Sequence, residues 1–279
     1  MIKVLSNGVK MPLLGLGTFL VQDGLSAYET VKYALEIGYR HIDTAQMYKN
    51  EESVGKAIQD SKIPRSEIFI TTKQGGHSTP EKMRAQFEES LKKLDTDYVD
   101  LYLIHWPNHD KTINQQTWAL FEELYQAGKC KAIGVSNFQK HHLIDLFETA
   151  KIKPMVNQVE LHPGLSQEPL KAFLDLEGIA IESYGPLMKG GVFEGIWGEG
   201  LSEIASKYHA SIAQVVISWG LQRDVIMIPK SVTKERIEEN FNAQYVNLSA
   251  EDMKTINQLN RGKRVYTDPD NSPWGPYKP

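Results

Sequence analysis

Short runs of apolar, often β-branched residues alternate along the chain with longer stretches in which apolar positions recur every three or four residues. The short runs predict strands and the longer stretches predict helices. The predicted strands are Leu14–Gly17, His41–Ala45, Ile68–Lys73, Val99–His105, Ala132–Ser136, Val156–Glu160, Ala180–Tyr184 and Val225–Pro229. Helices are predicted near residues 25–37, 51–60, 80–94, 114–127, 139–149, 166–176, 200–209 and 233–240. This alternation indicates βαβ units around a parallel sheet.

Eight such units favour the α/β class and a closed (β/α)8 TIM barrel over an open sheet. Two segments lie outside the units. Residues 2–11 carry Asn7-Gly8 between short apolar runs, which predicts an N-terminal β-hairpin that plugs the amino-terminal end of the barrel. A C-terminal helix is predicted at Ala250–Leu259, followed by a proline-rich tail to Pro279. Because no Gly/Ser-rich linker interrupts the chain, residues 1–279 are expected to form a single domain.

Composition narrows the range of functions. The chain has 279 residues, 41% of them hydrophobic, which is enough for a large core and fits one barrel. The net charge of −4 gives no electrostatic reason to expect nucleic acid as a partner. The single cysteine, Cys130, excludes an intramolecular disulfide and a Cys-rich metal site. The chain shows no signal-peptide stretch and no apolar run of about 20 residues, so a cytoplasmic protein without membrane contact is expected.

Titratable side chains stand at or just beyond the ends of three successive predicted strands. Asp43 and Tyr48 accompany the second strand, Lys73 ends the third, and His105 ends the fourth. The carboxyl ends of barrel strands meet at one mouth, so these four side chains are expected to lie together. A tyrosine, a lysine, an aspartate and a histidine in one mouth suggest proton transfer to a carbonyl group.

Each of the four residues has a distinct expected role. The ordinary pKa of tyrosine is about 10, and a nearby ammonium lowers it by favouring the phenolate. Lys73 is expected to act on Tyr48 in this way, while Asp43 holds Lys73 in place and His105 donates a hydrogen bond to the substrate oxygen. Taken singly, Tyr48 would also fit a residue that packs on the surface. Lys73 would also fit a solvated side chain at the end of a strand. Asp43 is unusual in any strand, because a buried unpaired aspartate is costly.

Several longer motifs resemble the aldo-keto reductase family. They are residues Gly38–Gly55, Leu101–Pro107, Ile133–Phe138, Val156–Pro163 and Ile228–Ser231, which follow the family order over almost the whole chain. The resemblance implies that Asp43, Tyr48, Lys73 and His105 form a catalytic tetrad with the tyrosine as acid. The short chain and compact late loops are most similar to the microbial branch that includes 2,5-diketo-gluconate reductases and small-aldehyde reductases.

The chain has no hydride donor of its own, so a carbonyl reductase would need a cofactor. Gly15-Leu-Gly17 lacks the third glycine of a Rossmann fingerprint and suits a tight passage from strand to loop. The better candidate is Lys230–Asn240, which follows the last strand and opens a helix, where phosphate groups are favoured. On its own, this segment also fits an ordinary capped helix with a charged face.

The resemblance implies NADPH as the cofactor. Residues matching Lys230, Ser231, Thr233 and Arg236 hold the adenosine 2′-phosphate, and those matching Glu239 and Asn240 contact the adenine. Residues matching Ser136, Asn137 and Gln158 bind the nicotinamide amide, and the residue matching Tyr184 stacks on the nicotinamide ring. Further cofactor contacts are expected at Gly17, Thr18, Asp43, Gly185, Pro186, Leu187 and Val232. Arg236 favours NADPH over NADH because it can neutralise a 2′-phosphate.

The expected substrate pocket has one unusual wall. Phe19 and Trp106 match pocket positions of the family, beside Tyr48 and His105. Relatives commonly carry a large apolar residue and a tryptophan after the tetrad lysine, whereas this chain has Gln74–His77 there. That change predicts either an open, loose wall or merely a flexible turn.

Two other segments each allow two interpretations. The segment Gly190–Trp197 either shapes the cofactor rim or covers the core. Trp274, in the tail, either closes over the pocket or belongs to a surface strap.

No metal is expected. His141 and His142 are neighbours on a predicted helix, where successive side chains point about 100° apart, so they are not expected to face one site. His162 precedes Pro163 and is interpreted as structural.

The leading functional interpretation is an NADPH-dependent reductase of aldehydes and ketones that acts as a monomer on a small-molecule carbonyl substrate. One alternative is a barrel isomerase or lyase in which residues near Lys230 grip a phosphorylated sugar. The other is a catalytically weak, NADPH-binding regulatory subunit, against which the intact tetrad argues.

Overall fold

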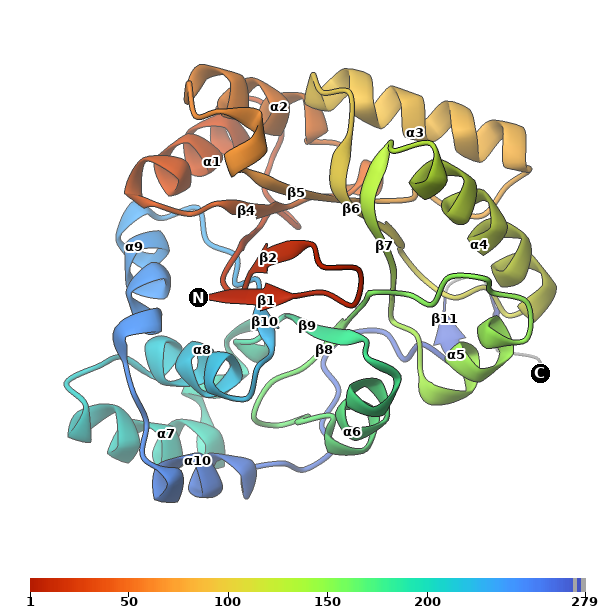
Figure 1. The fold of residues 1–279 in the computed structure, drawn as a ribbon. Helices are drawn as coiled ribbons and strands as arrows, with labels where there is room; N and C mark the ends of the chain where they lie inside the picture. Colours follow the sequence, from red (N-terminus) through yellow and green to blue (C-terminus); the bar gives the residue numbers. More distant parts are fainter. Residues whose placement is uncertain (273–274, 277–279) are drawn as a thin grey trace.

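Eight parallel strands form one sheet in chain order in the computed structural model, which describes residues 1–272 and 275–276 (Figure 1). The strands are β3 (Leu16–Gly17), β4 (His41–Asp43), β5 (Phe69–Lys73), β6 (Val99–Ile104), β7 (Cys130–Ser136), β8 (Val156–Glu160), β9 (Ala180–Tyr184) and β10 (Ile226–Met227). A parallel bridge joins Leu14 to Met227, and the Gly17 N–H donates to the Pro229 carbonyl at 3.1 Å. The sheet therefore closes on itself, and the predicted barrel is confirmed.

Ten α-helices surround the barrel in the described part of the chain (Figure 1). They are α1 (Leu25–Ile37), α2 (Glu51–Asp60), α3 (Pro80–Leu94), α4 (Lys111–Gln126), α5 (Lys140–Phe147), α6 (Glu168–Glu177), α7 (Gly195–Lys207), α8 (Ile212–Gln222), α9 (Lys234–Asn242) and α10 (Ala250–Asn257). Short 3-10 turns are η1 (Gln46–Tyr48), η2 (Arg65–Glu67), η3 (Met188–Phe193) and η4 (Ala243–Tyr245). Local sequence sets several of these ends. Thr79 caps α3 ahead of Pro80, and Gly38 ends α1 in the left-handed conformation.

Helix α8 was absent from the sequence-based prediction, which placed one helix between β9 and β10 where the structure has α7 and α8. Its sequence, IAQVVISWGLQ, is apolar nearly all round, and eight of its eleven residues are buried. Such a helix lacks the alternating apolar and polar faces that mark a surface helix. A start signal was present, because Ser211 and Gln214 form a capping box.

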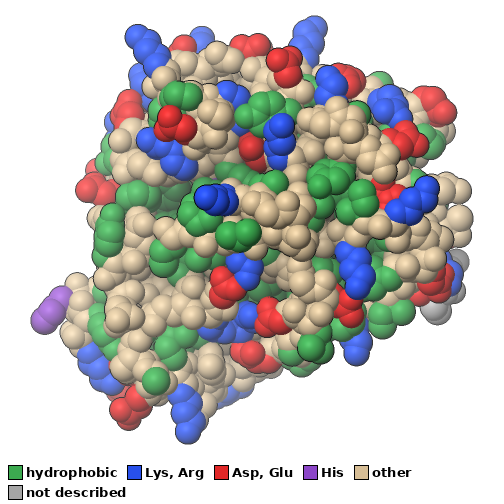
Figure 2. Space-filling model, viewed as in Figure 1, with side chains coloured by type: hydrophobic (Ala, Val, Ile, Leu, Met, Phe, Trp, Pro, Cys, Tyr) green, Lys and Arg blue, Asp and Glu red, His purple; other side chains and the backbone are tan. Residues whose placement is uncertain are grey.

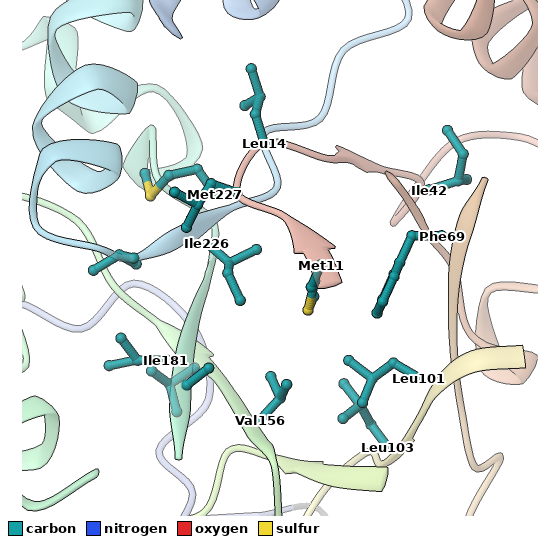
Figure 3. Close-up of a cluster of buried hydrophobic side chains, with 14 of the residues drawn as sticks. Met11, Leu14, Ile42, Phe69, Leu101, Leu103, Val156, Ile181, Ile226 and Met227 are labelled. Carbon is teal, nitrogen blue, oxygen red and sulfur yellow. The ribbon is translucent and has the colours of Figure 1, made fainter. Parts of the chain in front are cut away.

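The amino-terminal hairpin lies across one end of the barrel (Figure 1). Its strands are β1 (Ile2–Val4) and β2 (Lys10–Pro12), joined through Asn7-Gly8. Met11 is fully buried and points in among side chains from the barrel strands (Figure 3). The Asn7 side chain donates to the Lys131 carbonyl at 2.9 Å, and Lys3 pairs with Asp224. Because Lys131 and Asp224 lie near the amino ends of β7 and β10, the hairpin plugs the predicted end.

Apolar side chains from successive strands fill the barrel beneath the hairpin. Figure 3 shows this cluster, which includes Phe69, Leu101, Leu103, Val156, Ile181 and Ile226. Burial of apolar area favours folding by roughly 25 cal/mol per Å². Asp43 and Lys73 are the last residues of β4 and β5, so they lie on the carboxyl-terminal side of this cluster, where the candidate site lies.

On the surface, the face viewed in Figure 2 carries interspersed acidic and basic side chains. No helix among the described residues is long and apolar enough to cross a membrane. The tail ends in β11 (Asn271–Ser272), paired with β12 (Gly275–Pro276). Trp274, which is expected either to close over the pocket or to belong to a surface strap, lies outside the described residues.

Candidate active site

The four predicted catalytic residues meet at the carboxyl end of the barrel. Asp43 ends β4, Lys73 ends β5, His105 follows β6, and Tyr48 closes the turn η1. The Lys73 ammonium donates to Asp43 Oδ1 at 2.6 Å and to the Tyr48 hydroxyl at 3.3 Å. The Tyr48 and His105 ring centroids lie 5.6 Å apart with nearly perpendicular planes. In the parallel register Asp43 pairs with Thr71 and Lys73 with Leu103, so both tetrad residues lie within two residues of the end of the neighbouring strand.

Burial, rather than the charge of Lys73, has the largest effect on the pKa of the Tyr48 hydroxyl. Burial first, and then the nearby Asp43 and Glu182 carboxyl groups, raise the pKa of Tyr48 well above its ordinary value. The expectation that Lys73 lowers this pKa below 10 is therefore wrong for the side chains as they stand here. The physical cause of the raised pKa is the enclosure of the phenol within the barrel mouth. The phenol therefore keeps its proton at neutral pH.

Asp43 and His105 also respond to burial. Burial raises the pKa of Asp43 above its usual range, and Lys73 and the Gln158 side chain oppose this rise. Burial and the positive charge of Lys73 lower the pKa of His105 to about 3. The His105 ring is therefore neutral at physiological pH and has one N–H to donate.

A second set of polar side chains extends from the tetrad along the mouth. The Gln158 side-chain amide nitrogen donates to Asp43 Oδ2 at 2.8 Å, and the Ser136 hydroxyl donates to the backbone carbonyl of Gln158 at 2.9 Å. Asn137, in the left-handed conformation, donates to the His105 carbonyl at 3.0 Å and accepts from the Tyr184 hydroxyl at 2.7 Å. The residues predicted for the nicotinamide end thus form one connected row beside the tetrad.

Other predicted cofactor residues form two further groups. Thr18 donates to the Asp43 carbonyl at 2.9 Å, which ties the loop after β3 to the tetrad strand. An added Cβ at Gly17 would lie only 2.9 Å from the Ile228 carbonyl oxygen, so glycine permits the barrel to close there. The loop after β9 contains Gly185, Pro186 and Leu187.

The segment after β10 forms a cationic, largely exposed corner at the start of α9. Ser231 accepts from the Thr233 N–H at 3.1 Å, and Thr233 precedes the first helical residue. Asn240 is buried, whereas Arg236 is exposed. The described side chains here also include Lys230, Val232 and Glu239. Exposed cations at a helix amino terminus form a suitable site for a phosphate group.

The C-terminal tail is clamped over the mouth by a buried carboxylate that sequence reasoning missed. Glu160, the last residue of β8, accepts from the Val265 N–H at 2.6 Å and pairs with Arg264 at 3.3 Å. The clamp places the Tyr266 ring edge-on to Tyr184, with centroids 5.2 Å apart. A glutamate at the end of a predicted strand was the available signal, by the same reasoning that singled out Asp43.

The wall after Lys73 is more firmly held than the Gln74–His77 sequence suggested. Gln74 is buried, and its amide nitrogen donates to the Gly76 carbonyl at 2.7 Å. The His77 Nε2 atom lies 2.9 Å from the Trp106 carbonyl oxygen. The Phe19 ring lies 5.1 Å from the Tyr48 ring. The predicted pocket residue Phe19 therefore contacts the tetrad, and Trp106, which follows His105, is held by His77.

The segment Gly190–Trp197 belongs to η3 and the start of α7. The Trp197 indole donates to the Leu259 carbonyl at 3.0 Å and packs against the core. This arrangement favours the core-covering interpretation over the rim of the cofactor site.

The expectation that His141 and His142 do not face one site is wrong. Their Nε2 atoms lie 2.9 and 3.6 Å from the same Asp270 oxygen, because the first turn of α5 lets both rings lean toward the tail. However, His142 Nδ1 accepts from the Gln139 N–H at 3.0 Å. In a neutral ring that acceptor leaves the proton on Nε2, the atom that would have to bind a metal. The absence of a metal stays a prediction.

The barrel and its mouth define a (β/α)8 enzyme of the α/β class, with a phenol, an ammonium, a carboxyl group and an imidazole in hydrogen-bonding range or ring contact. The chain belongs to the aldo-keto reductase family, because residues 13–261 match the Aldo/keto reductase family. It is therefore an oxidoreductase, as predicted.

Two curated relatives differ in the reaction that their names state. The chain is 49% identical over 271 residues to a glyoxal reductase of Bacillus subtilis, covering 95% of each chain. It is 48% identical over 268 residues to a 9,11-endoperoxide prostaglandin H2 reductase of Trypanosoma cruzi, covering 96% of this chain and 94% of the relative. The predicted likeness to microbial small-aldehyde reductases is confirmed by the first of these.

A solved structure also matches nearly the whole chain. It is MGS-M4, an aldo-keto reductase enzyme from a Medee basin deep-sea metagenome library, with a TM-score of 0.93 and 47% sequence identity. The match covers 98% of this chain and 99% of that one.

Proposed function

We propose that this protein reduces aldehydes and ketones to alcohols with NADPH, with Tyr48 as the proton donor. The observation that carries the proposal is the buried Lys73 ammonium, which lies 2.6 Å from Asp43 and 3.3 Å from the Tyr48 hydroxyl. The proposal includes a single domain over residues 1–279, a monomer, a cytoplasmic location, and neither metal nor nucleic acid. The direct test is to supply NADPH with α-dicarbonyls, sugars, aromatic aldehydes and keto acids and to follow loss of the reduced nicotinamide absorbance.

In this proposal, each residue of the tetrad has one task at the substrate oxygen. The neutral His105 donates a hydrogen bond that orients the carbonyl, and Tyr48 transfers its proton to the oxygen as negative charge develops there. Lys73 stabilises the phenolate that remains, and Asp43 fixes the position of Lys73. General acid catalysis of this kind typically contributes about 10²–10⁴-fold to the rate.

The residues present fit a nicotinamide dinucleotide phosphate. When bound, this cofactor supplies the hydride. Ser136, Asn137 and Gln158 offer hydroxyl and amide groups for a carboxamide at the tetrad, and Tyr184 offers an aromatic face beside them. At the other end, the cationic corner at the start of α9 suits a phosphate. The proposed 2′-phosphate contacts are Lys230, Ser231, Thr233 and Arg236, and the proposed adenine contacts are Glu239 and Asn240.

Replacement of Arg236 by alanine is expected to weaken NADPH binding roughly tenfold or more, because a hydrogen bond to a charged group contributes about 1.5–3 kcal/mol. NADH lacks the 2′-phosphate, so its affinity should change little. Titration of cofactor fluorescence with both nucleotides measures the two effects.

A matched control for this variant is Arg261→Ala. Arg261 is also exposed, and its side chain donates hydrogen bonds to the backbone carbonyls of Gln258 and Asn260. This control should bind both cofactors as the wild type does. Equal losses for NADPH and NADH in Arg236→Ala would refute the 2′-phosphate role.

Small, unhindered aldehydes and α-dicarbonyls are expected to be better substrates than bulky steroids. Trp106 is held by His77, Phe19 packs on Tyr48, and Tyr266 is clamped beside Tyr184. These fixed aromatic groups leave little freedom to enclose a large substrate. The measurement is kcat/KM for methylglyoxal, an aromatic aldehyde and a ketosteroid. A steroid preferred by about an order of magnitude would contradict the prediction, and would place the chain nearer its prostaglandin-reducing relative in specificity.

The two alternatives predict different results. A barrel isomerase or lyase would convert a phosphorylated sugar without oxidising NADPH. A regulatory subunit would bind NADPH tightly and turn over no carbonyl.

A further inference from the structure

A second buried carboxyl group lies directly behind the tetrad. Glu182 is in the middle of β9, beside Gln158 in the parallel register, and it is fully buried. Its Oε2 atom accepts from the Gln158 amide nitrogen at 2.9 Å. The same nitrogen donates to Asp43 Oδ2 at 2.8 Å. One side-chain amide therefore connects Glu182 to the carboxyl group that holds Lys73.

Among the residues that the structure describes, the other groups facing Glu182 supply no second cation. His41, from β4, has its Nε2 atom 3.7 Å from Glu182 Oε1. Burial and the positive charge of Lys73 lower the pKa of His41 to about 3, so its ring is neutral at physiological pH. The Asp43 carboxyl group also raises the pKa of Glu182, and Glu182 in turn raises the pKa of Tyr48. Lys73 is therefore the cation that both Asp43 and Glu182 share.

The bridge also fixes which end of the Gln158 amide is available to a ligand. Both carboxyl groups occupy the –NH2 end, which is the only donor of that side chain. The Gln158 oxygen is thereby left for a partner that donates an N–H, such as the carboxamide of the proposed cofactor. A glutamine free to rotate would present either end.

We propose that Glu182 is a positioning residue of the reductase: it orients the Gln158 amide and sets the charge around Asp43 and Lys73. This inference rests on the proposed function. Burial and the neighbouring Asp43 raise the pKa of Glu182 to about 8. At neutral pH the group is protonated, and the positive charge of Lys73 is balanced by Asp43. Above pH 8 a second negative charge appears, which raises the pKa of Tyr48 further and makes it a weaker acid.

The kinetic test compares wild type with Glu182→Gln, in which an amide of similar shape still accepts from Gln158 but does not titrate. Wild-type kcat/KM for reduction should fall to a lower plateau, about five- to tenfold down, as pH rises through 8. The Glu182→Gln variant should match wild type within about twofold at pH 7 and lose this step. The control Glu51→Gln removes another buried carboxyl group, held by Thr72 and Ser90, and should keep the step.

A second measurement does not need activity. The folded pKa of Glu182 lies above its ordinary value of 4.5, so the folded protein binds a proton that the unfolded chain has released. Wild type should therefore lose stability as pH rises from about 4.5 to 8 and then level off. Glu182→Gln escapes this loss, so its Tm relative to wild type should rise by roughly 5 °C or more between pH 5 and pH 8.

The outcomes separate the two proposals. If wild type oxidises no NADPH with any carbonyl, the proposed function fails, whereas the Tm comparison still reports on Glu182. If the Tm difference is flat between pH 5 and 8, or if Glu182→Gln keeps the alkaline step, the role of Glu182 is overturned.

Discussion

Replacement of Tyr48 by phenylalanine is expected to lower kcat for carbonyl reduction by about 10²–10⁴-fold, the usual contribution of a general acid. The substitution removes the hydroxyl that lies 3.3 Å from Lys73 and keeps the ring that packs against Phe19 and His105. NADPH affinity should therefore change little. Single-turnover kinetics at saturating cofactor, together with a fluorescence titration of NADPH, measure both quantities.

A matched control for this variant is Tyr28→Phe. The Tyr28 hydroxyl hydrogen-bonds to Asp60 on the outside of the barrel at 2.8 Å, so its loss should leave kcat unchanged. If Tyr48→Phe kept most of the wild-type kcat, the proton would have to come from another group, and the assignment of Tyr48 would fail.

Replacement of Lys73 by methionine is expected to damage both activity and stability. Lys73 and Asp43 are both buried, and the ammonium also donates to the Thr44 carbonyl at 2.8 Å. Removing one partner of a buried ion pair typically costs about 3–5 kcal/mol, because the other charge is left uncompensated. For a chain of this size, Tm should fall by roughly 10 °C. The rate of carbonyl reduction should also fall, because the variant lacks the Lys73 ammonium beside the Tyr48 phenol.

The double variant Asp43→Asn/Lys73→Met separates these two effects. Because it removes both charges, Tm should recover much of the loss, while reduction should stay impaired. Thermal denaturation and steady-state kinetics at matched temperature provide the comparison. A Lys73→Met protein with wild-type kcat would contradict the role given to the ammonium.

The barrel and the tetrad were accessible from sequence because each depends on local patterns. Apolar residues recur at different spacings in strands and helices, so the eight alternating strand and helix segments could be recognised. Parallel strands in a barrel bring their carboxyl ends to one mouth, which places the tetrad residues together. Strand ends shifted by one or two residues, as at β4, which ends at Asp43 rather than at Ala45. Helix α8 escaped because it is buried nearly all round and so has no polar face to mark its period.

The surroundings of the tetrad depended on contacts between distant parts of the chain. Sequence placed Lys73 near Tyr48, but the extent of burial, which determines the pKa of the phenol, depends on the complete barrel. The hydrogen bonds from Gln158 to Asp43 and Glu182 cross 115 and 24 residues of chain. The Glu160 clamp reaches Val265, which is 105 residues away. Glutamates inside predicted strands were the visible anomaly, yet their partners could be found only in the fold.

The most direct test of carbonyl reduction at this site is to follow the hydride itself. NADPH carrying deuterium at the transferable position of the nicotinamide is incubated with methylglyoxal, and the alcohol product is examined by NMR and mass spectrometry. The proposed function predicts one deuterium on the new carbinol carbon for each NADPH oxidised, with turnover nearly lost in Tyr48→Phe. Product without deuterium, or equal turnover in wild type and Tyr48→Phe, would contradict it.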